Sequence, residues 1–320
     1  MGRILLTGAS GFVGGAIHEY LSNSSTHKLT VALRRPMSSL PVTTTLAQID
    51  QIDGVTDWSR ALLDSDVVIH AAARVHVMQE SSTDPLTSFR KVNVEGTLNL
   101  ARQAAEKGVR RFIFISSIKV NGEETSLGVP YTACAEPAPA DPYGISKMEA
   151  EKGLMRIASE SGMEVVIIRP PLVYGPGVKA NFFNMMKWLY RGVPLPFGAI
   201  CNSRSLVALD NLVDFVVTCI DHPKAANQVF LVSDGDDLST TELLKKMGRA
   251  LGKPARLLPV PSGVLTLAAT LLGKKTLSQR LCGSLQVDIT KNRELLNWLP
   301  PVTVETELDA VAKDFLDKHV

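Results

Sequence analysis

The chain has 320 residues, which corresponds to about two domains or to one large α/β unit with an appended lobe. It is 45% hydrophobic and 21% charged, which excludes a wholly disordered protein. A formal net charge of +2, from 34 basic and 32 acidic residues, excludes a general role in coating nucleic acid.

The first half of the chain alternates short apolar strands with helical patterns. Strands are expected at residues 4–7, 29–33, 67–71, 112–115 and 165–168, and helices at 11–21 and 89–106. Continuous apolar strands that alternate with helices are typical of a parallel sheet covered on both faces. The sequence therefore predicts an α/β fold with a Rossmann-type, doubly wound parallel sheet.

A glycine-rich turn follows the first expected strand and opens a helix. Gly8 allows a tight turn, Gly11 lets the backbone approach a pyrophosphate, and Gly14 lets the helix pack close to the sheet. The spacing is GxxGxxG instead of GxGxxG, and glycines at such a turn can serve geometry alone. The strand–turn–helix context nevertheless favours a dinucleotide site, because a helix N-terminus attracts phosphate. The expected cofactor contacts here are Gly8, Ser10, Gly11, Phe12, Val13 and Gly14.

The end of the second expected strand indicates which dinucleotide is bound. An enzyme that uses NAD usually carries Asp or Glu there to hold the ribose 2′-hydroxyl. This chain carries Arg34 and Arg35 instead, and guanidiniums suit a 2′-phosphate. We therefore expect NADP(H) to be preferred, with NAD(H) possible. The adenine contact is left open between Asp50 and the pair Gln51 and Ile52.

Three residue types that move protons between oxygen atoms occur together. Ser116 and Ser117 follow the strand at 112–115, and Tyr143 and Lys147 lie one helical turn apart. Tyrosine titrates near pH 10, so a nearby lysine cation and an oxidised nicotinamide would be needed to lower its pKa. A lone YxxxK pair is common on surface helices, but its combination with the serines and the glycine turn predicts a catalytic group of Ser117, Tyr143 and Lys147.

Two further cations follow strand ends. Arg74, just after the strand at 67–71, is expected to reach the substrate. Lys119, two residues after Ser117, has two interpretations of equal weight: contact with a substrate oxygen or phosphate, or exposure to solvent from a loop.

The chain changes character after Tyr174. Glycines and prolines become frequent, and helices are expected at 181–191, 238–251 and 304–318. We assign residues 1–174 to a dinucleotide-binding domain that carries the catalytic residues. Residues 175–320 form mainly a substrate lobe, from which segments near 206–209 and 229–232 return to the sheet.

The longest apolar run, residues 264–272, is too short to span a bilayer. We interpret it as a buried helix, with peripheral membrane contact as the minor alternative. The four cysteines are widely spaced and form no CxxC pair, so no metal site is expected and a reducing cytoplasm is favoured.

In its motifs the chain resembles the extended short-chain dehydrogenases/reductases of the NAD-dependent epimerase/dehydratase type. The motifs are TGASGFVG, DVVIHAAA, NVEGT, SSIKVNG, PYGISK and RPPLVYGPG, and the similarity runs from Gly2 to about Asp314. The resemblance implies that Ser117 and Tyr143 are catalytic, and that Lys147 binds the nicotinamide ribose. It also implies further cofactor contacts at Ala71, Ala72, Ala73, Asn93, Ser116, Pro170 and Val173.

The same resemblance implies a nucleotide-sugar site in the C-terminal lobe. Asn181 would hold the diphosphate, Pro196 would lie along the uracil, and Arg204 would pair with phosphate. Arg280 is a weaker candidate for a second phosphate-binding cation. The family also implies a homodimer formed by the helices at 89–106 and 148–161.

The reaction is predicted from these features together. The two arginines favour an enzyme that consumes NADPH, and the motifs look most like those of bacterial UDP-4-keto-6-deoxy-N-acetylhexosamine 4-reductases of polysaccharide synthesis. The alternative is a UDP-hexose or UDP-N-acetylhexosamine 4-epimerase, and a second is a non-catalytic NADP-binding sensor. Dehydration is disfavoured because no acid pair follows Ser117.

Overall fold

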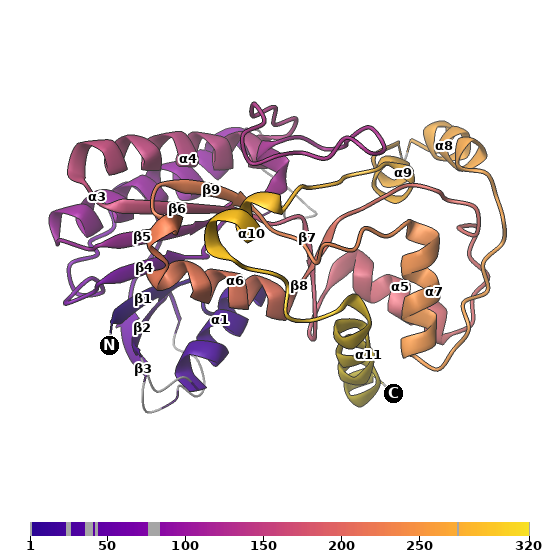
Figure 1. Cartoon of the computed structure of the whole chain (residues 1–320), viewed down its shortest axis with the longest axis horizontal. Coiled ribbons are helices and arrows are strands. Elements are labelled where there is room, and N and C mark those ends of the chain that lie inside the picture. Colours follow the sequence, from indigo (N-terminus) through magenta and orange to yellow (C-terminus); the bar gives the residue numbers. More distant parts are fainter. Residues whose placement is uncertain are drawn as a thin grey trace.

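A parallel seven-stranded sheet forms one side of the molecule, and a mainly helical lobe forms the other (Figure 1). The computed structural model describes residues 2–23, 27–35, 41, 44–75, 84–273 and 275–319. The strands are β1 (Arg3–Thr7), β2 (Lys28–Leu33), β3 (Thr44–Gln48), β4 (Val67–His70), β5 (Arg111–Ile115), β6 (Glu164–Arg169), β7 (Leu172–Tyr174), β8 (Leu206–Ala208) and β9 (Gln228–Leu231).

The helices alternate with these strands and then dominate the C-terminal half. They are α1 (Phe12–Asn23), α2 (Pro85–Phe89), η1 (Arg90–Gly96), α3 (Thr97–Glu106), η2 (Ile118–Val120), α4 (Pro142–Ser161), α5 (Ala180–Tyr190), α6 (Leu209–Asp221), η3 (Pro223–Ala225), α7 (Thr240–Ala250), α8 (Ser262–Leu271), α9 (Lys275–Cys282), α10 (Thr290–Leu296) and α11 (Val304–His319).

The sheet has the order β3-β2-β1-β4-β5-β6-β9, and every pair in it is parallel. Side chains of β1 alternate between its faces, as Leu5 and Leu6 show. Leu6 packs in the core beneath α1 and α6, and Leu5 in the core beneath α3 and α4. Figure 1 shows these two helix layers above and below the sheet. The predicted doubly wound Rossmann-type fold is therefore confirmed.

Two C-terminal segments differ in how they pair. β9 lies beside β6 as the last strand of the main sheet. β8 pairs instead with β7 in a separate two-stranded sheet, so the expected return of residues 206–209 to the main sheet is wrong. The reason is that β7 comes directly after Pro170 and Pro171, where the chain has already left the main sheet.

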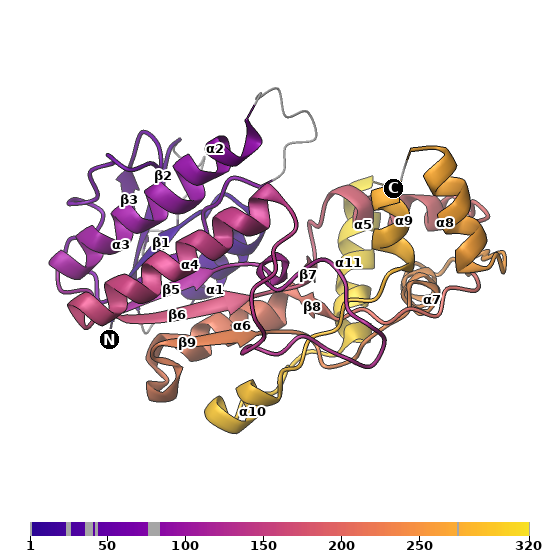
Figure 2. The same ribbon diagram turned by 90° about the horizontal axis from the view of Figure 1, so that it is seen from above.

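The substrate lobe has a core of its own. Side chains from α5, α7 and α11 meet there, among them Met186, Leu244 and Val311. Figure 2 shows α8 and α9 side by side at the far end of this lobe. The interpretation of residues 264–272 as a buried helix is wrong: in the part of the chain that the structure describes, α8 has no buried residue. None of the described helices is long and apolar enough to cross a bilayer.

Candidate active site

The glycine turn lies at the carboxyl end of β1, against the residues that follow β4. Gly8 has a φ of 79°, and a Cβ atom there would lie 2.6 Å from the backbone nitrogen of Ala72. A Cβ on Gly14 would overlap the carbonyl of Gly8. Only glycine fits these two positions, so the turn packs directly against the residues after β4 and α1 begins immediately beside it, with its N-terminus at the carboxyl edge of the sheet, where a phosphate group would be favoured. The residues present therefore fit a dinucleotide.

The neighbouring strand ends complete this edge of the sheet. Arg34 and Arg35 follow β2 and are both exposed, which leaves their guanidiniums accessible. Asp50 and Gln51, two of the open candidates for the adenine contact, are exposed as well. Asp53 is not among the residues that the sequence indicated for the adenine contact. It is buried and accepts hydrogen bonds from Val55 and Thr56 in its own loop, and these bonds lower the pKa of its carboxyl group.

Ser117 and Tyr143 meet where β5 and α4 converge. Ser117 lies near enough to act on the pKa of Tyr143, and the Tyr143 ring packs edge-on against the buried Phe89 with 6.0 Å between the ring centres. Burial and the negative charge of Asp141 raise the pKa of Tyr143 to about 12, against the opposing effect of Ser117. The expected lowering of this pKa is therefore absent in the chain alone, because desolvation disfavours the phenolate.

Lys147 lies one turn further along α4 and is fully buried. Its Nζ donates a hydrogen bond to the carbonyl of Ile115 at 2.7 Å and lies 3.9 Å from the centre of the Phe114 ring. Burial lowers the pKa of Lys147 to about 7, and Glu151 opposes this effect. The ammonium group is thus held at the carboxyl end of β5, beside the loop that carries Ser117.

A buried polar network supports this loop from below. Ser116 donates to Glu151 at 2.5 Å, and Glu151 forms an ion pair with Arg169 at 2.5 Å. Arg169 also donates to Asn121 at 3.0 Å. Glu151 therefore occupies the hydroxyl of Ser116, which the sequence assigned to the cofactor. The carbonyl of Pro170 accepts from the backbone N–H of Ile118 at 3.0 Å, so the predicted cofactor contact Pro170 also lies against this loop.

Asn93 connects α4 with the loop after β4. It lies in the π-helical turn η1, and its amide donates to Ser146 and to the carbonyl of Arg74, each at 3.0 Å. Its carbonyl oxygen accepts from the backbone N–H of Arg74 at 2.8 Å. Asn93 thus fixes Arg74 relative to the helix that carries Tyr143. Ala71, Ala72 and Ala73 are half-buried at the same edge.

Lys119 is engaged by two carboxylates of the protein. It donates to Glu123 at 2.8 Å and to Asp141, the residue that caps the N-terminus of α4. The ammonium group is neither directed to open solvent nor free of protein contacts. Lys119 instead ties the Ser117 loop to the start of the helix that carries Tyr143.

Arg204 and Arg280 are far apart in the sequence, but Arg280 lies near enough to act electrostatically on Arg204. Burial and the positive charge of Arg280 lower the pKa of Arg204, and Glu123 opposes the shift. Arg204 donates to the carbonyl of Gly283 at 2.9 Å. Two cations that repel each other at one site are typical of a place that receives an anion.

The other predicted substrate contacts lie on separate segments of this lobe. Asn181 is exposed in the first turn of α5, and Pro196 is half-buried in the loop that follows it. Val173, a predicted cofactor contact, is half-buried in β7.

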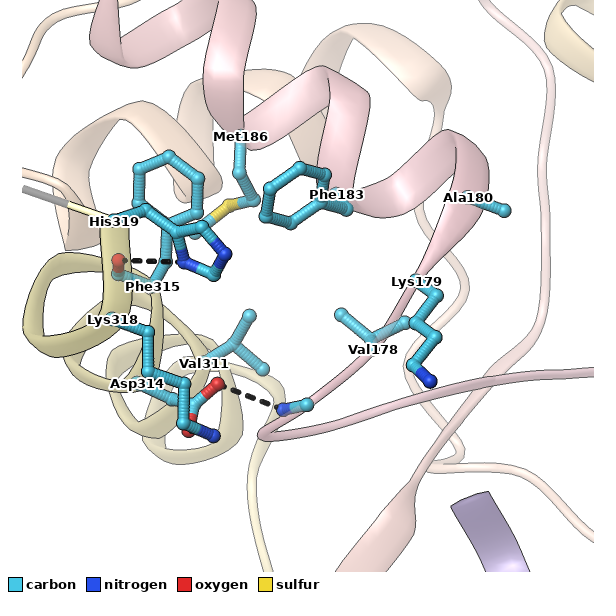
Figure 3. A pocket seen from close by; sticks show the side chains of 11 residues that line it. Val178, Lys179, Ala180, Phe183, Met186, Val311, Asp314, Phe315, Lys318 and His319 are labelled. Carbon is cyan, nitrogen blue, oxygen red and sulfur yellow. Dashed lines mark hydrogen bonds and ion pairs between the residues drawn. The ribbon is translucent and has the colours of Figure 1, made fainter. Parts of the chain in front are cut away.

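A cavity of about 310 Å³ lies elsewhere, between α5 and α11 (Figure 3). Phe183, Met186 and Phe315 line it, together with Lys179 and Lys318. It shares no residue with the group around Tyr143, so the reacting groups do not lie in it.

The sequence missed several supporting residues. The ring of His70 is fully buried, with Nδ1 2.7 Å from the hydroxyl oxygen of Thr7 and Nε2 3.0 Å from that of Thr97. Burial lowers the pKa of His70 to about 3. It therefore stays neutral and joins β1, β4 and α3. A histidine in an otherwise apolar strand was the available signal. No comparable signal linked Glu151 with Arg169, because they are 18 residues apart on a helix and a strand.

Comparison with known proteins places this site in a family. The family described as "NAD dependent epimerase/dehydratase family" matches residues 4–233. The chain belongs to this family. A relative from Vibrio cholerae, named UDP-glucose 4-epimerase, is 51% identical over 317 residues, which covers 99% of this chain and 96% of the relative. A GDP-6-deoxy-D-mannose reductase from Pseudomonas aeruginosa is 26% identical and covers 98% of this chain and 97% of its own length.

Solved structures of the family have the same fold. The UDP-N-acetylglucosamine 4-epimerase from Bacillus cereus superimposes with a TM-score of 0.80 at 20% identity, over 98% of this chain and 99% of the other.

These relatives correct the predicted reaction. The interpretation as a 4-reductase is wrong, because the relative that shares half of the residues is named a 4-epimerase and the reductase shares only about a quarter. The prediction rested on Arg34 and Arg35 and on a resemblance of the motifs to those of 4-reductases. A cofactor that is reoxidised within each turnover can be either NAD or NADP. Arg34 and Arg35 therefore do not indicate whether the enzyme carries out a net reduction.

Proposed function

We propose that the protein is a UDP-hexose 4-epimerase, which inverts the configuration at C4 of a UDP-linked glucose or N-acetylglucosamine. The observation that carries the proposal is the link between the Ser117–Tyr143 pair and the Arg204–Arg280 pair. Glu123 lies six residues after Ser117 and acts electrostatically on Arg204. The next residues also join the two parts, since Thr125 donates to the carbonyl of Ser284 at 2.8 Å. A sugar at Tyr143 and a diphosphate at the arginines therefore belong to one substrate.

The chain's own residues would handle the proton at the sugar oxygen. The phenolate oxygen of Tyr143 accepts the O4 proton as the C4–H bond breaks, and the resulting phenol returns that proton to O4 when the bond forms again. Ser117 donates a hydrogen bond to O4 throughout. A positive charge on Lys147, which is held at the carboxyl end of β5 beside this loop, would favour the phenolate form of Tyr143.

The turn at Gly8, the start of α1 and the residues Ala71–Ala73 would hold a nicotinamide dinucleotide. Such a group supplies a reversible hydride acceptor for C4. Because the hydrogen must return to the opposite face of C4, the sugar ring has to rotate within the site while the diphosphate stays bound. Arg204 and Arg280 would provide that fixed end, and Asn181 and Pro196 would border the nucleotide.

Two finer points are part of the proposal. The exposed pair Arg34 and Arg35 would let the adenosine end accept the 2′-phosphate of NADP. The helices η1, α3 and α4 pack against one another along the chain and would pair with those of a second copy in a homodimer.

The decisive test supplies the purified protein with UDP-glucose or UDP-N-acetylglucosamine and a catalytic amount of NAD⁺ or NADP⁺. We expect C4 inversion of at least one sugar to an equilibrium mixture, without accumulation of reduced cofactor, and inversion that is about 10²–10⁴-fold slower for Tyr143→Phe. Failure of all four combinations, with the cofactor bound, would overturn the proposal and favour a non-catalytic NADP-binding protein.

A further inference from the structure

Helix α8 presents its apolar stripe away from the protein. Val264, Leu267, Ala268, Leu271 and Leu272 follow the spacing i, i+3, i+4, i+7, i+8, which defines one face of a helix. In most surface helices this face is buried in a core. Here the four large side chains are exposed by 55%, 63%, 80% and 73% in chain order.

The opposite face accounts for the attachment of the helix. Leu265 and Ala269, one turn apart, are half-buried, and α8 packs beside α9 (Figure 2). Leu258, in the segment that leads to α8, adds a further side chain that is 53% exposed. The helix is therefore packed against the lobe through one face, and its apolar face is exposed at the end of the lobe.

The segment of chain that carries this surface has charges of one sign in its sequence, and one of them, Lys246, is paired with Glu305 of α11. Residues 243–287 contain eight lysines and arginines and not one aspartate or glutamate. Lys253 and Arg256, both exposed, precede α8, and the sequence continues after it with a pair of lysines. The chain as a whole carries a charge of only +2, so this segment is a local concentration of positive charge.

We infer that α8 binds the surface of an anionic lipid membrane, with its apolar stripe among the acyl chains and the flanking cations at the headgroups. An apolar helix face flanked by lysine and arginine is the combination that inserts into a bilayer interface. A second copy of the chain is a poorer occupant, because pairing two such faces would bring two segments without acidic residues together. This inference is independent of the proposed reaction.

The location of α8 places the proposed membrane contact close to the proposed diphosphate site. Arg280 lies on α9, the helix against which α8 packs, and acts electrostatically on Arg204. A membrane bound at α8 would therefore lie next to the lobe that is proposed to hold the sugar diphosphate.

The test is co-sedimentation of the full-length protein with vesicles of phosphatidylglycerol and phosphatidylcholine, or of phosphatidylcholine alone. We expect binding to the anionic vesicles that weakens with added salt. The double variant Leu267→Glu/Leu271→Glu should bind about tenfold more weakly or worse, because it places charge in the inserted face. Leu63→Glu, at a leucine that is 71% exposed in the other lobe, is the matched control and should bind as the wild type does.

Three outcomes would overturn the inference: no binding of the wild type to anionic vesicles at low salt, equal binding by the double variant, or a wild-type dimer in solution that the double variant dissociates. Circular dichroism shows whether each variant is folded. Epimerase assays with soluble UDP-sugars are run in parallel, so that loss of membrane binding is distinguished from loss of the proposed activity.

Discussion

Glu151 and Arg169 form a buried ion pair directly beneath the serine loop, with 2.5 Å between Oε2 and Nη2. Both side chains are about 95% buried, and each has a second partner: Ser116 for the carboxylate and Asn121 for the guanidinium. The pair connects α4 to the end of β6. It therefore fixes the distance between the helix that carries Tyr143 and the strand end beside Ser117.

Removal of one partner of this pair should be costly. We expect Glu151→Gln to lower the free energy of unfolding by about 3–5 kcal/mol, because the buried guanidinium of Arg169 loses its counter-charge. Denaturant unfolding measures the change. Glu149→Gln, on the same helix, removes the exposed partner of Arg90 and should have a far smaller effect. Equal effects of the two variants would contradict the structural role of the buried pair.

Tyr143→Phe keeps the ring that packs on Phe89 and removes only the hydroxyl group. We expect C4 inversion to slow by about 10²–10⁴-fold, with cofactor binding retained, because general acid–base catalysis contributes that much. Turnover and cofactor titration are measured on the same preparation. Tyr20→Phe, at an exposed tyrosine on α1, serves as the control. Turnover near that of the wild type would remove Tyr143 from the mechanism.

Cofactor choice tests the role of the arginines after β2. Replacing Arg34 with Asp and Arg35 with Leu should weaken NADP binding more than NAD binding, by about 1.5–3 kcal/mol for each charge-assisted bond lost. Titration of both cofactors into both proteins measures the difference. Arg102→Asp, at an exposed arginine on α3, controls for the loss of positive charge at a surface site away from β2. An equal loss for the two cofactors would show that the pair does not contact the 2′-phosphate.

Glu307 makes stability depend on pH. This carboxyl group on α11 is 1% exposed, and burial together with Asp210 and Asp234 raises its pKa from 4.5 to about 7. The folded state therefore holds a proton that the unfolded state releases between pH 4.5 and about 7. Its contribution is complete below pH 4.5 and is lost as the pH rises through 7.

The free energy of unfolding of Glu307→Gln, relative to that of the wild type, should increase as the pH rises across this window. The increase should be up to about 1.4 kcal/mol per pH unit. Unfolding midpoints from pH 5 to about 7.5 measure the trend. Glu305→Gln is the control, because the hydrogen bond from Lys246 lowers the pKa of Glu305, so the stability difference between this variant and the wild type should not change with pH across this range. A constant difference between wild type and Glu307→Gln would contradict the raised pKa.

The sequence alone determined the sheet and its cofactor edge. Strand periodicity and the glycines at positions 8, 11 and 14 follow from local backbone requirements, so they predict the Rossmann-type layer without any long-range information. The YxxxK spacing likewise placed Tyr143 and Lys147 on one helix face, since four residues make about one turn. The adjoining strand ends of a parallel sheet brought Ser117 to the same edge.

Only the tertiary structure decided how these groups are supported and charged. The pKa of Tyr143 depends on burial and on Asp141, and Lys119 is held by two carboxylates that its sequence position does not reveal. Glu151 and Arg169 meet because α4 lies across the sheet. The stripe of α8 is exposed although its spacing is that of a core helix, because periodicity defines a face but not what covers it. Burial and the packing of whole elements against one another determine each of these features, and neither is encoded in local sequence spacing.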